Sequence, residues 1–140
     1  MSFGVPIHVA ILSEYVQQVR VIPLDGRPHL PQRVRQWLGD SRGHWEGQTR
    51  VVETTNFHEK RLFLGRTAEH LRVVERFTRD EADSIDYQFT ADDPTTWTKP
   101  WTAAVSVAKT DGEIFEFACH EGNYGLRNIL SVARAQESLR

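Results

Sequence analysis

Hydrophobic and polar positions alternate along several stretches in the second half of the chain, and this is the pattern of half-buried strands. Ile85, Tyr87 and Phe89 alternate with polar residues, and three neighbouring runs show the same period of two. Asp111-Gly112 lies between the last two runs and is typical of a hairpin turn. The pattern therefore predicts a meander of four consecutive antiparallel strands, over residues 71–78, 84–90, 102–109 and 113–119.

The first half of the chain is less regular. Alternating β-branched residues predict two extended segments within residues 7–24, and Asp25-Gly26-Arg27-Pro28 predicts a turn after them. A further strand signal covers residues 44–55, with a turn at 46–48. Between these, Pro31 lies where the first turn of a short helix over residues 31–37 would be. Residues 56–70 predict a loop with one helical turn.

The period changes to that of a helix at the end of the chain. Leu126, Ile129, Leu130 and Ala133 share one helical face, which predicts a C-terminal helix over about residues 126–138. We expect one mainly β domain over residues 1–140, with seven or eight antiparallel strands. They would form a curved sheet or a small lipocalin-like barrel or half-barrel. The helix would plug one end of the barrel or cover one face of the sheet.

Composition narrows the classes of partner. The chain has 140 residues, 39% of them hydrophobic and 26% charged, which is typical of a globular domain. A formal net charge of −2 provides no general attraction to nucleic acid or anionic lipid. The apolar runs are much shorter than the roughly 20 residues of a membrane-spanning helix. We therefore expect neither a nucleic acid nor a membrane as partner.

The ends and the single cysteine add little about location. Cys119 is the one cysteine, so the chain forms no internal disulfide. Residues 1–10 lack the basic and apolar regions of an export signal. The chain as given is therefore expected to stay in the cytoplasm, where it is made.

The sequence His-Glu-Gly-Asn-Tyr-Gly at residues 120–125 is the most suggestive chemical motif. His120 could act as a general acid or base, and Glu121 could orient it or bind a metal. Asn123 or Tyr124 could then stabilise an oxyanion. The alternative interpretation is a turn whose polar groups cap the following helix, because Asn and Gly are favoured in turns.

Aromatic and cationic residues suggest a ligand pocket. Its candidate lining residues are Trp37, Trp45, Trp97, Trp101, Tyr124 and Asn123, with Arg35 and His120 as polar contacts. The tryptophans could instead close the ends of a β core. Arg33 to Arg42 could clamp an anion or form a solvated loop.

A second kind of candidate is a carboxylate within a strand. Glu14, Glu53 and Glu75 lie in strand-like runs, and one that points inward needs a partner such as Arg20, Arg72 or Arg76. The six histidines form no recognised zinc pattern, so no metal ligands or cofactor are assigned. A metal site assembled from distant strands stays an alternative.

Several motifs together resemble a family of uncharacterised bacterial proteins of the acidobacterial type. They are IPLDGRPH (22–29), WLGDSRGHWEG (37–47), VVETTNF (51–57), VERFTR (74–79), DPTTWTKPWT (93–102) and HEGNYG (120–125). The resemblance implies no function and no catalytic residue. Members are usually longer and carry an export signal, so this chain resembles their C-terminal part. It departs from their pattern at residues 48–50 and at residues 13 and 17–18.

Three functions follow as hypotheses. The first is a small-molecule-binding β domain with the aromatic pocket described above. The second is a hydrolase or lyase that uses His120, Glu121 and Tyr124. The third is a structural or interaction domain without a pocket. An open sheet edge would favour a homodimer in any of the three.

Overall fold

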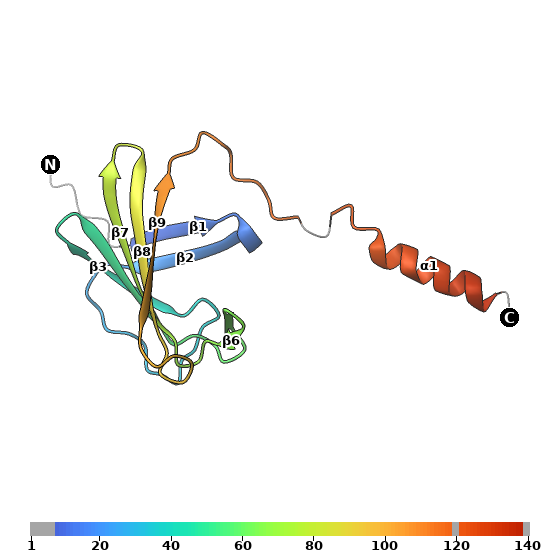
Figure 1. Ribbon diagram of the computed structural model, residues 1–140, viewed down its shortest axis with the longest axis horizontal. Helices are drawn as coiled ribbons and strands as arrows, with labels where there is room; N and C mark the ends of the chain where they lie inside the picture. Colours follow the sequence, from blue (N-terminus) through green and yellow to red (C-terminus); the bar gives the residue numbers. More distant parts are fainter. Residues whose placement is uncertain (1–7, 119–120, 139–140) are drawn as a thin grey trace.

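The computed structural model describes residues 8–118 and 121–138, and their strands pair into antiparallel sheets (Figure 1). The main sheet has five strands in the order β3-β4-β7-β8-β9. Its strands are β3 (Asp40–Glu46), β4 (Thr49–Thr55), β7 (Arg72–Glu81), β8 (Ser84–Asp92) and β9 (Trp101–Ala108). The predicted mainly β, antiparallel fold with a curved sheet is confirmed, and the sheet does not close into a barrel.

Two hairpins accompany the main sheet. β1 (His8–Ser13) and β2 (Gln18–Pro23) are joined through a 3₁₀ turn at Tyr15–Gln17, and they run across the strands of the sheet in Figure 1. β5 (Leu62–Phe63) and β6 (Arg66–Thr67) form a short hairpin within the region expected to be a loop with a helical turn.

Alternation along the strands gives the main sheet two different faces. Cross-strand register puts Glu75 opposite Phe89 and Phe77 opposite Tyr87 on one face, called here the inner face. The other, outer face carries charged and hydroxyl side chains that pair across strands, such as Arg72 with Glu53 and Thr90 with Thr102. The inner face therefore holds the aromatic side chains of the main sheet.

The β1-β2 hairpin packs on the inner face at Gly43 of β3. A Cβ atom at Gly43 would lie 2.5 Å from a methyl group of Leu24 and 3.0 Å from one of Ile22. Ile22 is fully buried there, as is Val52, which pairs with Gly43 across strands. A glycine in this strand thus allows the hairpin to approach the sheet closely.

A small apolar core lies below the hairpin. It consists of Phe57, Ala68, Leu71 and Ala91, with Phe63, Val73, Trp97 and Trp101 packed against it. The connections after β4 and after β8 supply several of these residues, so the loops close this end of the sheet.

The helix predicted over residues 31–37 is absent. Gln36 instead forms a parallel bridge to Phe57, in which its N–H donates to the Asn56 carbonyl and its own carbonyl accepts from the His58 N–H. Pro31 accepts from the Val34 N–H in a single turn. Pairing with a distant segment therefore supplies the hydrogen bonds that a helix would have formed internally.

The strand predicted over residues 113–119 is also wrong for the described residues 113–118, which form no strand and do not pair with β9. A two-residue type I′ hairpin turn requires positive φ at both central residues, and Gly112 does not adopt it. Its N–H bonds the Thr110 hydroxyl instead, at 3.1 Å. The chain consequently leaves β9 and runs away from the sheet.

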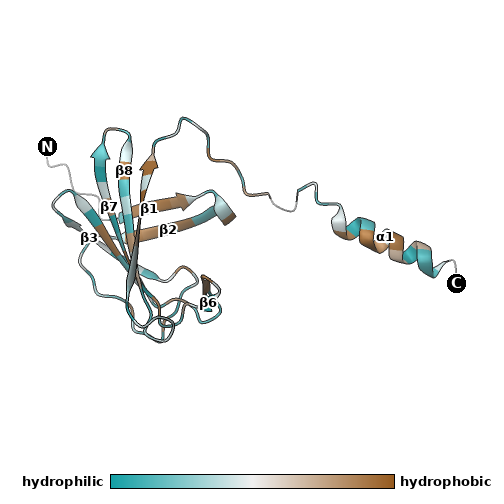
Figure 2. Cartoon of the chain, in the orientation of Figure 1, coloured by the Kyte–Doolittle hydropathy of each residue, from teal (hydrophilic) through white to brown (hydrophobic). Residues whose placement is uncertain are grey.

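The C-terminal helix is confirmed as α1 (Gly125–Glu137), but its predicted contact with the sheet is not found. Every described side chain from Glu121 onward is exposed, and α1 stands away from the sheet in Figure 1. Figure 2 shows hydrophobic and hydrophilic residues alternating around it, as expected for an amphipathic helix.

Candidate functional site

A buried carboxylate occupies the middle of the inner face. Glu75 on β7 is 5% exposed, and Arg20 reaches it from β2. The two terminal guanidinium nitrogens of Arg20 donate to the two carboxylate oxygens of Glu75 over 2.6 and 2.9 Å. This two-pronged geometry is the strongest pairing that arginine makes with a carboxylate. It also fixes the β1-β2 hairpin over the sheet.

Tyr87 on β8 completes this cluster. Its hydroxyl donates to Glu75 Oε1 over 2.9 Å. Burial and the negative charge of Glu75 raise the pKa of the Tyr87 phenol well above its ordinary value. Burial lowers the pKa of Arg20, but hydrogen bonds to Glu75 and its charge raise that pKa overall. Tyr87 therefore remains a neutral phenol over the physiological pH range, hydrogen-bonded to the Arg20–Glu75 ion pair.

Tyr87→Phe should destabilise the fold by about 1–2 kcal/mol at neutral pH, because a hydrogen bond to a charged group is lost. The difference in free energy of unfolding between the wild type and the variant should become smaller at alkaline pH. Above a pH of about 10 the unfolded chain releases the tyrosine proton while the native protein retains it, so the wild type loses stability as pH rises. Urea unfolding at several pH values from neutral upward checks this. A deficit that stays constant with pH would contradict it.

An open cavity of about 340 Å³ lies against this cluster. Apolar side chains from several elements line most of it, among them Phe57, Phe63, Leu71, Val73 and Phe89. Its polar groups are the cluster itself, Gln18 and Arg61. A mostly apolar hollow with a few convergent polar groups has the character of a small-molecule site.

Aromatic rings continue from the cavity along the inner face. Ring centroids are 4.9 Å apart for Phe77 and Tyr87, 6.0 Å for Tyr87 and Phe89, and 5.4 Å for Phe89 and Trp101. Phe63 then stacks on Trp101 at 6.3 Å. Such spacing is favourable for aromatic pairs, so these rings form one continuous apolar wall.

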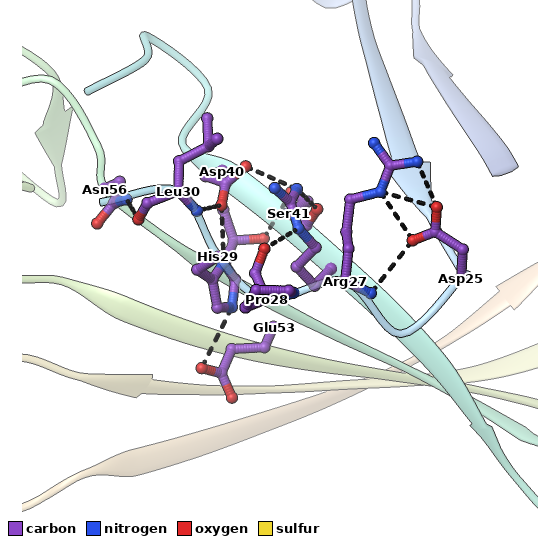
Figure 3. A network of polar contacts seen from close by, with 11 residues as sticks. Asp25, Arg27, Pro28, His29, Leu30, Asp40, Ser41, Glu53 and Asn56 are labelled. Carbon is purple, nitrogen blue, oxygen red and sulfur yellow. Dashed lines mark hydrogen bonds and ion pairs between the residues drawn. The ribbon is translucent and has the colours of Figure 1, made fainter. Parts of the chain in front are cut away.

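A second polar cluster ties the β2-β3 connection to the start of β3 (Figure 3). Asp40 is 2% exposed and accepts hydrogen bonds from the Leu30 N–H and from His29 Nδ1, both at 2.9 Å. Arg42 pairs with the other carboxylate oxygen of Asp40 at 2.6 Å. Nε2 of His29 faces Glu53 at 3.4 Å. The polar groups of this network bond to one another. We therefore interpret it as a structural clamp that holds the β2-β3 connection in place.

A broader groove next to that clamp, of about 580 Å³, contains several cations. Arg27 is paired with Asp25, Arg42 with Asp40 and Arg20 with Glu75. The pairing with Arg27 lowers the pKa of Asp25 to about 2. These cations are therefore already neutralised by carboxylates, and the groove provides little free charge for an anion.

The tryptophans predicted to form one pocket do not come together. Trp97 and Trp101 lie 5.7 Å apart against the core, whereas Trp37 contacts His58 and is about half exposed. The Trp45 ring lies under the Arg50 guanidinium, 4.3 Å away.

Arg35, the predicted polar contact, donates to the backbone carbonyls of Phe57 and Glu69. Its guanidinium also faces the Glu69 carboxylate at 3.3 Å. The side chain therefore joins two connections between strands and does not line the cavity.

The predicted acid–base motif stands apart from the sheet. His120 lies outside the described residues. Glu121 and Tyr124 are exposed, and the Asn123 side chain accepts from the Gly125 N–H over 3.0 Å at the start of α1. The described part of this motif thus resembles the capping turn that was the alternative interpretation.

Sequence reasoning found part of the cluster. Glu75 was one of three candidate glutamates and Arg20 one of three candidate partners, and the structure shows that Glu75 points inward and pairs with Arg20. Tyr87, Phe63 and Arg61 were missed as site residues. The available signal was a carboxylate on the same strand face as Val73 and Phe77, because a charged group on an apolar face requires partners.

Comparisons of the chain with known proteins identify no relative. No protein-family model matches the chain, and neither the curated proteins nor the solved structures contain a match. Within residues 8–118 and 121–138, no group of three or more His, Cys, Asp or Glu side chains could hold a metal ion. None of the helices in the described part is long and apolar enough to cross a bilayer.

Proposed function

We propose that the chain is a small-molecule-binding domain whose ligand occupies the cavity on the inner face of the sheet. The observation that carries the proposal is the cavity of about 340 Å³ with apolar walls and the Arg20–Glu75–Tyr87 cluster at its side. Its volume falls within the range of roughly 300–1,000 Å³ that is usual for ligand pockets. We propose a lipocalin-like mode of binding, with the ligand on the inner face of the curved sheet.

The energetics of the cluster support this role. A buried ion pair contributes little net stability, because removing two charges from water costs about as much as their attraction returns. Apolar side chains at the same positions would fold at least as well. A pair held rigid by two hydrogen bonds and flanked by aromatic rings instead provides fixed polar contacts for a ligand.

Val73 and Val74 provide a matched test, since they are adjacent on β7 and point to opposite faces. Val73 lines the cavity, and Val74 lies on the outer face. Val73→Phe should fill the cavity and lower the affinity for the neutral fluorescent probe phenylnaphthylamine at least tenfold. Val74→Phe adds the same bulk and should leave the affinity unchanged. Fluorescence titration measures both.

The titration can also reject the proposal. Wild-type protein that fails to bind the probe at its solubility limit would overturn it. Equal affinity in Val73→Phe and wild type would do the same, because the probe would then lie elsewhere. Near-ultraviolet circular dichroism establishes that each variant is folded.

A further inference from the structure

The charges around the cavity do not cancel. Glu75 accepts two hydrogen bonds from Arg20 and one from Tyr87, so its carboxylate is neutralised and surrounded by donors. Arg61 lines the same cavity and brings a second guanidinium. The cations Arg20 and Arg61 and the carboxylate of Glu75 together give the cavity lining a net charge of one positive unit.

Arg61 is held in place by its main chain and not by a carboxylate. Its N–H donates to the His58 carbonyl over 2.9 Å, and its carbonyl accepts from the Ala68 N–H over 2.8 Å. Within the described part of the chain, its side chain forms no hydrogen bond or ion pair. Arg27, Arg35 and Arg42 are all paired with carboxylates. Arg61 thus has unused side-chain donors beside the cavity and a backbone that two hydrogen bonds hold in place.

The cavity therefore favours a ligand anion over a ligand cation. A cation would compete with Arg20 for Glu75 and would face Arg61 across a mostly apolar space. An anion would meet the five donors of a guanidinium in a geometry that suits carboxylate, sulfonate or phosphate oxygens. Such a bond is stronger in a partly desolvated cavity than in water.

We propose that the ligand of this cavity is an amphipathic organic acid, with its apolar body against Val73 and Phe89 and its anionic group on Arg61. The inference rests on the proposed function, because it assigns the chemical class of the ligand to the same cavity. It also assigns Arg61 as the residue that selects the anion.

Two probes of nearly the same shape test it, anilinonaphthalene sulfonate and the neutral phenylnaphthylamine. Arg61→Gln should weaken sulfonate binding by roughly ten- to a hundredfold, the loss of one charged hydrogen-bonded contact. Affinity for the neutral probe should change less than twofold. Arg66→Gln, on the exposed strand β6, is the matched control and should alter neither affinity. The sulfonate affinity should also fall with added salt, and the neutral probe's should not.

The outcomes separate this inference from the function it rests on. If Val73→Phe abolishes binding of both probes but Arg61→Gln leaves the sulfonate affinity unchanged, the cavity binds ligands and the assignment of an acid is wrong. Equal loss of sulfonate binding in the Arg61 and Arg66 variants also overturns the inference, since it would show general surface attraction. If neither probe binds the wild type, the proposed function fails as well.

Discussion

Arg20→Met is expected to destabilise the protein by about 3 kcal/mol or more, the largest single effect in this chain. Methionine retains much of the apolar volume of arginine but leaves the Glu75 carboxylate buried without its cation, and breaking a buried pair typically costs about 3–5 kcal/mol. The hairpin β1-β2 would also lose its polar contact with β7.

Urea unfolding followed by tryptophan fluorescence measures this loss. Arg66→Met is the control, because Arg66 is exposed on β6, and it should change stability by less than about 0.5 kcal/mol. Adding Glu75→Leu to Arg20→Met should recover much of the deficit by removing the isolated charge. A single Arg20→Met variant as stable as the wild type would show that the pair is not buried in solution.

Gly39→Ala should be the second most damaging substitution, at about 3 kcal/mol. Gly39 has φ +74°, which is unfavourable for alanine by about 1–2 kcal/mol. The added Cβ would also lie 2.6 Å from the Thr54 methyl, 2.8 Å from the Thr55 carbonyl oxygen and 2.9 Å from the Phe57 ring. The carbonyl belongs to β4 and cannot rotate away, so overpacking adds a further cost of about 1–3 kcal/mol.

Gly26→Ala separates the two contributions. Gly26 has nearly the same φ, +73°, but open space around it. The variant should therefore lose only the conformational part, about 1–2 kcal/mol. Thermal or urea unfolding of both variants gives the comparison, and an equal loss at the two glycines would contradict the close packing at Gly39.

The strands were predictable where local pattern decided them. Period-two alternation located β7, β8 and β9 to within a few residues, and the turn at Gly47 located the β3-β4 hairpin. The helix prediction for residues 31–37 was wrong because Gln36 pairs with a segment about 20 residues away, which no local pattern reveals. The strand prediction after β9 was wrong for the described residues because Gly112 does not adopt the hairpin turn that the local sequence favours.

The site was less predictable than the fold, because it depends on how the β1-β2 hairpin lies on the sheet. Sequence alone shows that Glu75 would need a cation if buried, but Arg20 is 55 residues away and several other arginines were equal candidates. The motifs that carry the family resemblance contain several predicted site residues, such as Trp37, Trp101 and His120. In the structure, His29, Asp40 and Asn56 from three of those motifs instead hold the β2-β3 connection in place.

Ligand binding at the inner face is the central property proposed for this protein. Methyl NMR of the full chain titrated with phenylnaphthylamine tests this directly, since Leu38, Leu71 and Val73 line the cavity while Val51 and Val74 lie on the outer face. We expect saturable shifts of the first three residues' methyl signals and none for the last two. Saturable shifts confined to Val51 and Val74, or no shift at any of the five at the probe's solubility limit, would contradict the account.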